Sequence, residues 1–339
     1  MRVPNRIFAV ATLLLWSEQV VAQDLQLSVP LQCSLGVDCF VQNYVDIDPG
    51  QAVLAADCGQ ASYNGHKGTD FRVLNTRVAA DVLAAAPGTV RALRNDMADR
   101  LVRTKEDRQA VQNRECGNGV VVSHGDGWET QYCHLRKGTV TVSVGDRIER
   151  GQPIGQVGYS GLAAFPHVHL TLRHNGETVD PFLGTVSETR RRAQACKAGA
   201  DTRVPMATSL WLDPALELLD HANGTLIETG LAGGPVGTLE LETASAPPAS
   251  ARAPALVFFA RLINLKKGDR VVLKLTGPNG LIAQSDGQPL EKNKAQWVAF
   301  TGRKTKPSGW DAGTYVGEVA LVRDGKEVLS ETTELDLTD

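Results

Sequence analysis

The sequence predicts a mainly β protein with two domains, and three observations support this prediction. The chain of 339 residues is too long for one ordinary domain and long enough for two modest hydrophobic cores. It contains 33 glycines and 16 prolines but only 5% aromatic residues, a composition that suits short strands and turns better than a helical bundle. Short runs of β-branched and apolar residues recur along the chain, with glycine-rich turns between them.

The first residues have the pattern of an export signal. Residues 1–6 carry two arginines, residues 7–16 form a short apolar run, and residues 20–22 offer small or β-branched side chains at the cleavage site. We expect residues 1–22 to be a signal peptide and the mature protein to be periplasmic or secreted. An uncleaved anchor is the alternative, although the run is short for a membrane span. No later segment is apolar enough to cross a bilayer, so we expect no transmembrane segment after signal removal.

Export also changes how the six cysteines are interpreted, because an oxidising compartment favours disulfides. Cys33 and Cys39 are close enough in sequence for a small local loop. The other four could form two more bridges, most simply Cys58–Cys116 and Cys133–Cys196, although their spacing permits other pairings. No pair has the CxxC spacing of a thiolate zinc site, so we expect structural disulfides.

After an irregular lead-in at residues 23–60, the segment 61–185 has the pattern of a β domain. The runs that we expect to be strands are Gly68–Val73, Gly119–Ser123, Glu129–Leu135, Thr139–Val144 and Val168–Arg173. Residues 94–115 are highly charged and lack this pattern, so we interpret them as a surface insertion, either irregular or helical.

Residues 186–244 are interpreted as a connector, and residues 245–339 as a small β-sandwich domain. An Ala/Pro/Ser-rich stretch at 244–254 marks the boundary. The strand-like runs beyond it are Leu256–Leu262, Arg270–Thr276, Gln296–Thr301 and Thr314–Val322. We expect Trp310 to pack in the core of this domain.

Two segments, 82–90 and 144–155, look like halves of one motif. Both resemble the hairpins of barrel–sandwich hybrid folds, in which β-branched residues face inward and glycines form the corners. Lipoyl and biotinyl carrier domains use similar hairpins, so the pattern predicts a fold and not an activity. A carrier function would need a modifiable lysine at the hairpin tip, and none is evident there.

Three short motifs carry candidate chemistry. In an extended strand the side chains of His66 and Asp70 lie on one face, and those of His167 and His169 share a face in the same way. His134 adds a further imidazole on another predicted strand. Each motif alone is common as ordinary structure, but together they indicate a metal site. The remaining histidines, His124, His174 and His221, are interpreted as structural or surface residues.

The residue types suit a catalytic zinc. Such a zinc takes three nitrogen or oxygen ligands and keeps a fourth position open for water. The metal lowers the pKa of that water and polarises a scissile carbonyl, while nearby imidazoles can manage protons and stabilise an oxyanion.

In their order along the chain, these motifs resemble those of the M23 family of zinc peptidases, the lysostaphin/LytM-type peptidoglycan endopeptidases. The resemblance covers about residues 50–185 and includes, besides the histidine motifs, the segments Gly117–Gly125, Val144–Asp146, Gly151–Gln152 and Gly158–Gly161. It implies an M23-type barrel–sandwich hybrid (duplicated hybrid motif) fold. It also implies one Zn²⁺ per chain held by His66, Asp70 and His169, with His134 and His167 as catalytic residues.

The resemblance implies an exported zinc metalloendopeptidase that hydrolyses peptide bonds in peptidoglycan cross-bridges or stem peptides. The alternative is a non-catalytic LytM-type protein that binds the wall or activates another hydrolase, but such proteins typically lack metal ligands that this chain retains. An exported peptidase acting on protein substrates is a third hypothesis. The formal net charge of −3 gives no electrostatic reason to expect nucleic acid as a partner. The sequence leaves the oligomeric state open.

Overall fold

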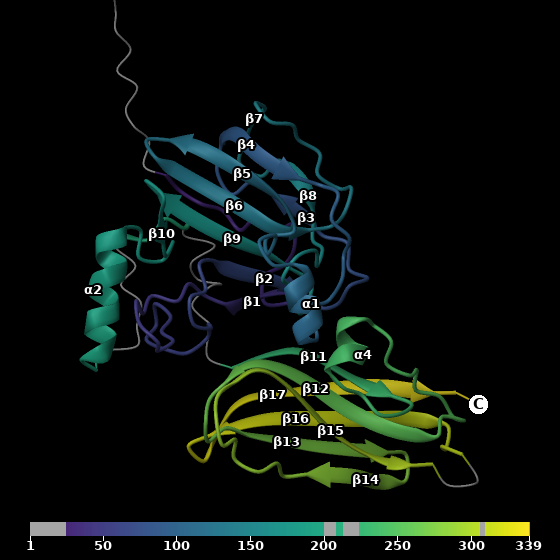
Figure 1. Cartoon of the computed structure of the whole chain (residues 1–339). Coiled ribbons are helices and arrows are strands. Elements are labelled where there is room, and N and C mark those ends of the chain that lie inside the picture. Colours follow the sequence, from purple (N-terminus) through teal and green to yellow (C-terminus); the bar gives the residue numbers. More distant parts are fainter. Residues whose placement is uncertain (1–24, 200–207, 213–223, 306–308, 339) are drawn as a thin grey trace, which may run out of the picture.

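The computed structural model of the protein describes residues 25–199, 208–212, 224–305 and 309–338 (Figure 1). The predicted signal peptide, residues 1–22, lies outside the described residues. The described chain is mainly β, as the sequence predicts, and its strands form two bodies. The N-terminal body comprises residues up to 212 and the C-terminal body those from 224 onward.

An antiparallel sheet in the order β1-β2-β9-β6-β5-β4-β7 forms the centre of the N-terminal body, and β10 pairs with β9 beside this path. The strands are β1 Cys39–Asn43, β2 Thr69–Val73, β4 Gly88–Arg94, β5 Asn118–Gly125, β6 Trp128–Leu135, β7 Arg147–Ile148, β9 His167–His174 and β10 Glu177–Val179. A separate pair joins β3 (Asp81–Leu83) to β8 (Pro153–Gln156).

One face of the large sheet is the hydrophobic core of this body. Phe71 of β2 and Val168 and Leu170 of β9 are buried there, because alternate side chains of a strand point to the same face. Just after β3, the backbone N–H of Ala85 donates a hydrogen bond of 2.8 Å to the hydroxyl of Tyr132 in β6. The opposite face of β2 and β9 therefore carries Asp70, Arg72, His167 and His169.

The two segments that the sequence predicts to be halves of one motif pair with each other. Strand β3 of the first segment pairs with β8 of the second, and β4 pairs with β7. Their inward residues, Val82, Val90, Ile148 and Ile154, are buried in the same core. This mutual pairing agrees with the predicted barrel–sandwich hybrid fold.

The predicted strand Thr139–Val144 is absent, and that prediction is wrong. Its β-branched residues suggested a strand, but turns at Gly138 and Gly145, both with positive φ, bound a segment whose Val140 N–H donates to the Asn95 side chain and not to a neighbouring strand. The Thr139 hydroxyl instead donates to the carbonyl of Arg136.

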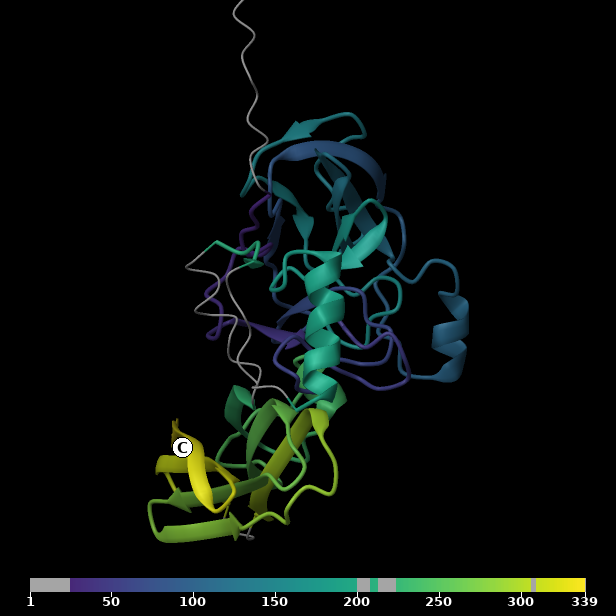
Figure 2. The ribbon, with the colours of Figure 1, turned by 90° about the vertical axis from the view of Figure 1, so that its left-hand side faces the viewer.

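Two helices lie at the periphery of the N-terminal body, and Figure 2 shows α2 running along one side of it. Helix α1 (Lys105–Ala110) lies within the charged segment 94–115. Helix α2 (Val186–Lys197) begins the segment 186–244, for which we expected a connector. Among the described residues, no helix is both long and apolar enough to cross a membrane.

All six cysteines form disulfides, but two of the three pairings differ from the simplest expectation. Cys33–Cys39 is present as predicted, whereas the other bridges are Cys58–Cys196 and Cys116–Cys133, not Cys58–Cys116 and Cys133–Cys196. Cys116 lies two residues before the β5–β6 hairpin and Cys133 near its end, so hairpin pairing brings them together. Cys58 is then left for Cys196 on α2.

Two sheets enclose the core of the C-terminal body, in the orders β11-β12-β15 and β14-β13-β16-β17. The elements are β11 Thr225–Ala232, α4 Thr238–Glu242, β12 Ala255–Leu265, β13 Arg270–Gly277, β14 Gly280–Ser285, β15 Lys294–Lys304, β16 Gly313–Arg323 and β17 Lys326–Leu337. Trp310 packs against this core. Strand β11 and helix α4 lie within 186–244, and β11 pairs with β12 along its length.

The two bodies meet at a buried apolar cluster next to β1 and β2. Phe40 and Leu74 of the N-terminal body contact Ile227 and Ile263 of the C-terminal body. The side chain of Asn264 also donates a hydrogen bond of 3.0 Å to the Gln42 carbonyl.

The core of the N-terminal body contains a buried carboxyl group, Asp180. One oxygen accepts the backbone N–H of Phe182 at 2.8 Å, and the other has no hydrogen-bond partner among the described residues. Burial, with a smaller effect of the Asp57 charge, raises the pKa of Asp180 to about 7. An unfolded aspartate has a pKa of about 4, so the folded protein holds this proton more tightly than the unfolded chain does.

We therefore expect Asp180 to make stability depend on pH. Its contribution is fully present below pH ~4 and is lost as pH rises through the folded pKa of about 7. Asp180→Asn should remove this loss, which is at most on the order of 3 kcal/mol between pH 5 and pH 8. Urea unfolding of wild type and Asp180→Asn at pH 5 and pH 8 measures this change in the free energy of unfolding. Asp96→Asn, at an exposed aspartate, is the control for loss of a charge. Equal pH dependence of wild type and Asp180→Asn would contradict the expectation.

Candidate metal and catalytic site

The antiparallel pairing of β2 with β9 builds the site. Its register places Asp70 directly opposite His169 and Arg72 opposite His167. These side chains share the polar face of the sheet, as the alternation argument predicted, because Phe71 and Val168 occupy the core face. Two sequence motifs almost 100 residues apart are thereby brought into contact.

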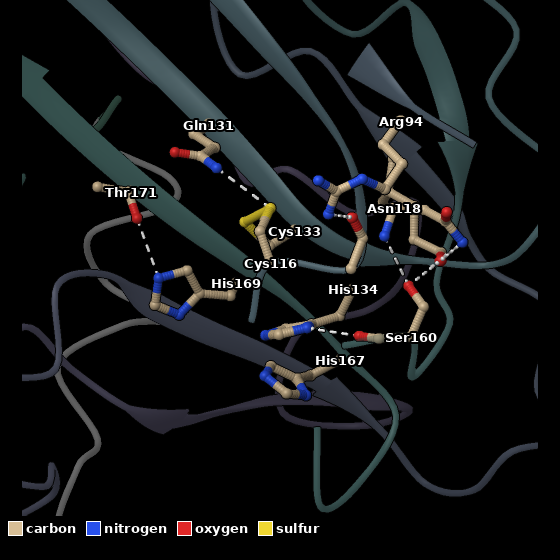
Figure 3. The surroundings of a disulfide bond; sticks show 12 residues. Arg94, Cys116, Asn118, Gln131, Cys133, His134, Ser160, His167, His169 and Thr171 are labelled. Atoms are coloured by element: carbon tan, nitrogen blue, oxygen red, sulfur yellow. Dashed lines mark hydrogen bonds between the residues drawn. A yellow bond between two sulfur atoms is a disulfide. The ribbon is translucent and has the colours of Figure 1, made fainter. Parts of the chain in front are cut away.

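His66 completes the cluster from the loop before β2. Its Nδ1–H donates to the carbonyl of Tyr44 at 2.7 Å, which leaves Nε2 facing Asp70 Oδ1 at 3.1 Å and His169 Nδ1 at 3.0 Å. The other ring nitrogen of His169 lies 2.9 Å from the hydroxyl of Thr171 (Figure 3). The Nδ1 of His169 is 2.8 Å from Asp70 Oδ1. One ligand atom from each of the three predicted ligands therefore converges on one point.

This donor set fits a zinc ion. The three donor atoms of His66, Asp70 and His169 lie within 4.8 Å of one another. Two imidazole nitrogens and one carboxylate oxygen are ligands that a catalytic zinc accepts. The backbone carbonyl at His66 and the hydroxyl at His169 each engage the far nitrogen of the ring, an arrangement typical of histidines that bind metals.

Asn43 is a site residue that the sequence did not reveal. It ends β1, and its Nδ2 donates a hydrogen bond of 2.7 Å to the second oxygen of Asp70. Both side chains are buried, so this bond fixes the orientation of the carboxylate. An asparagine in an irregular lead-in has no sequence signal of its own, since only the β1–β2 pairing brings it to Asp70.

His134 reaches the site because strand β6 is irregular at this point. Asn118 pairs with Leu135 and Val120 with Tyr132, so β6 has one extra residue between the two pairs. His134 has a φ of 66° there, and the bulge turns its side chain away from the core face on which Tyr132 lies. Its Nδ1–H donates to the Ser160 carbonyl at 2.8 Å (Figure 3). Simple alternation would have given the wrong face.

His167 lies beside both His134 and the metal-ligand candidates. Its ring centroid is 4.6 Å from that of His134, and its Nε2 is 3.6 Å from Asp70 Oδ1. Its Nδ1–H donates to the carbonyl of Phe165 at 2.8 Å. In His134 and His167 alike, a backbone carbonyl engages Nδ1 and directs Nε2 toward the cluster.

Burial and neighbouring charges shift the pKa values of the clustered histidines and of Asp70. Burial lowers the pKa of His134 well below its usual value, and the charges of His167 and His169 add to this effect. Burial also lowers the pKa of His167 despite the opposing charge of Asp70. Burial raises the pKa of Asp70, but the charges of His66 and His167 and the imidazole hydrogen bonds outweigh it, so that pKa lies well below its usual range. His134 and His167 are therefore neutral beside an ionised carboxylate at neutral pH.

The pKa of His66 shifts in the opposite direction from those of His134 and His167. Burial lowers its pKa, but the charge and hydrogen bond of Asp70 and the Tyr44 carbonyl outweigh burial, and the pKa is raised. The field that draws a proton to His66 would also favour a divalent cation, which supports the fit of the donor set to a metal.

Tyr63 forms the exposed rim of the site and was also missed from the sequence. Its side chain is 52% exposed, and its ring centroid lies 4.4 Å from that of His66. The other described histidines are elsewhere: His124 binds the Pro87 carbonyl, and His174 stacks on Trp128. His221 lies outside the described residues.

Comparisons with known proteins identify the region that contains the site. The model of peptidase family M23 matches residues 64–181. A relative named uncharacterized metalloprotease, from Haemophilus influenzae, is 31% identical over 117 residues, or 34% of this chain and 20% of the relative. Peptidoglycan DD-endopeptidase ShyA from Vibrio cholerae is 31% identical over 121 residues, or 36% of this chain and 23% of ShyA. The chain thus spans about a fifth of the length of these relatives.

Among solved structures, the catalytic domain of the antimicrobial peptidase lysostaphin from Staphylococcus simulans aligns with 41% of this chain and 85% of that chain. The identity is 23% and the TM-score is 0.26.

Proposed function

Residues 64–181 of this chain belong to peptidase family M23, and from that premise we propose that the protein is an exported zinc metalloendopeptidase that cleaves peptide bonds of peptidoglycan. The observation that carries the proposal is the convergence of His66 Nε2, Asp70 Oδ1 and His169 Nδ1 on one point. These three residues would hold one Zn²⁺ per chain. When bound, the metal supplies Lewis-acid polarisation of the scissile carbonyl and acidifies a water molecule.

His134 and His167 are the proposed catalytic residues. Because both are neutral imidazoles with Nε2 directed at the cluster, either can accept the proton of the attacking water. The imidazolium so formed can stabilise the developing oxyanion and return the proton to the leaving amine. Their backbone partners, the carbonyls of Ser160 and Phe165, hold the rings in place for this task.

Peptidoglycan as the substrate is supported by the relatives, one of which is named a peptidoglycan DD-endopeptidase. A non-catalytic wall-binding protein or hydrolase activator is the alternative. The presence of all five site side chains, His66, Asp70, His134, His167 and His169, in one cluster favours the enzyme. The three disulfides support export to an oxidising compartment.

We expect the two histidines of β9 to respond differently to substitution. His169→Ala removes a ligand, so zinc content and activity should both fall. His167→Ala and His134→Ala leave the three ligands intact and should keep zinc, yet lose about 10²–10⁴-fold in turnover. Zinc is measured by elemental analysis, and activity by mass spectrometry of muropeptides released from purified sacculi.

His174→Ala is a matched control on the same strand, because His174 lies outside the cluster. A His167→Ala protein that loses zinc as completely as His169→Ala would refute this division of roles. Wild-type protein that holds zinc but releases no muropeptides would refute the peptidoglycan endopeptidase itself.

A second expectation concerns Asn43. Asn43→Ala removes the hydrogen bond that orients the Asp70 carboxylate, and loss of such an outer contact typically costs about 10–100-fold in metal affinity. Competition with a chromogenic zinc chelator measures the affinity. The control is Asn64→Ala, which removes an exposed asparagine in the loop before His66. Equal zinc affinities of Asn43→Ala and wild type would show that this bond does not support the metal.

A further inference from the structure

A buried side chain of the N-terminal body, Arg72 of β2, links the candidate site to the C-terminal body. Arg72 follows Asp70 on the polar face of β2 and is fully buried. Its guanidinium donates five hydrogen bonds. The Nε atom donates to the Val73 carbonyl, and one terminal nitrogen donates to the side chains of Gln42 and Gln296. The other terminal nitrogen donates to both carboxylate oxygens of Glu242 at 3.0 Å. Gln296 and Glu242 belong to the C-terminal body. The position of the guanidinium is thus set by both bodies.

The same guanidinium contacts the support of His167. Its central carbon lies 4.9 Å from the ring centroid of Phe165. The Phe165 ring stacks on the His167 imidazole with centroids 4.4 Å apart, and the Phe165 carbonyl accepts the Nδ1–H of His167. Cation–π and stacking contacts have preferred geometries, so a fixed guanidinium restricts the phenyl ring, which in turn restricts the imidazole.

Glu242 is held as firmly as Arg72. It is fully buried at the end of α4 and also receives a hydrogen bond of 3.0 Å from the Gln296 amide. A second buried arginine, Arg261 of β12, lies 3.3 Å from the Glu242 carboxylate and donates to the Leu74 carbonyl at 2.7 Å. A planar arginine fork between fixed carboxylate oxygens permits only a narrow range of orientations.

We propose that Arg72, fixed by Glu242 of the C-terminal body, is a positioning residue for His167 and acts on it through the ring of Phe165. The C-terminal body is then a structural part of the active site and not a separate attachment. This inference rests on the proposed function, because it takes His167 to handle protons in the reaction. It differs from a role in holding zinc, since none of the side-chain hydrogen bonds and ring contacts described above for Arg72, Phe165 and Glu242 involves a proposed zinc ligand, His66, Asp70 or His169.

The test uses the full-length mature protein loaded with zinc. Glu242→Gln preserves side-chain shape but removes the charge and the two-oxygen acceptor of Arg72, and Phe165→Leu removes the intermediate ring. Each should lower kcat by between about 10-fold and 100-fold with KM and zinc content unchanged, because a small misplacement of a reacting group has this effect.

Phe165→Tyr keeps the ring and should retain wild-type kcat. Asp269→Asn is the matched control, since Asp269 is an equally buried partner of an arginine, Arg323, inside the C-terminal body.

The double variant Glu242→Gln/Phe165→Leu separates the proposed route from general destabilisation. If Glu242 acts through Phe165, the double variant should lose no more kcat than Phe165→Leu alone. Multiplicative losses in the double variant would overturn the proposal. So would a Glu242→Gln protein that loses no more kcat than Asp269→Asn.

A measurement without turnover keeps this inference distinct from the proposed function. In protein with isotope-labelled histidine, Glu242→Gln should shift the ring resonances of His167, which lies against Phe165, and leave those of His174 in place. If wild type cleaves no sacculi, the proposed function fails while this comparison still tests the positioning. Unchanged His167 resonances in Glu242→Gln would overturn the positioning role even in an active enzyme.

Discussion

The register between β2 and β9 is the constraint on which the site depends. It places Asp70 opposite His169 and Arg72 opposite His167 in a single stretch of antiparallel pairing. A slip of one residue would turn every one of these side chains into the core and expose Phe71 instead. Burial of Phe71, Val168 and Leu170 on the other face therefore fixes the site geometry. The packing that forms the core therefore also assembles the site.

The loops around this sheet supply backbone carbonyls that orient the histidine rings. The carbonyls of Tyr44, Ser160 and Phe165 each accept the Nδ1–H of one histidine and so choose which nitrogen faces the cluster. A backbone acceptor in a folded loop is less mobile than a side chain, which favours a preorganised site. The Cys116–Cys133 disulfide holds the bulged part of β6 from which His134 projects (Figure 3).

The sequence predicted those parts of the fold and site that depend on local pattern. Alternation along a single strand placed His167 and His169 on one face, and glycine-separated runs located most strands. The same argument does not apply to His66, which lies in the loop before β2 and not on a strand with Asp70. Features that depend on contacts between distant segments were not accessible in this way. Two of the three disulfides were mispaired because Cys116 and Cys133 meet across the β5–β6 hairpin and Cys58 meets Cys196 on α2. Asn43 and Arg72 acquire their partners only through β1–β2 pairing and docking of the C-terminal body.

The contact between the two bodies combines two kinds of interaction with different consequences. The apolar cluster of Phe40, Ile227 and Ile263 stabilises association but tolerates small shifts, since hydrophobic contact is not directional. The buried ion pair of Arg72 and Glu242 contributes little net stability, because desolvation offsets much of the Coulomb attraction. Its hydrogen bonds are directional, however, and separating the charges inside the protein would be costly. The apolar cluster thus holds the bodies together, whereas the ion pair selects one orientation, at a position two residues from Asp70.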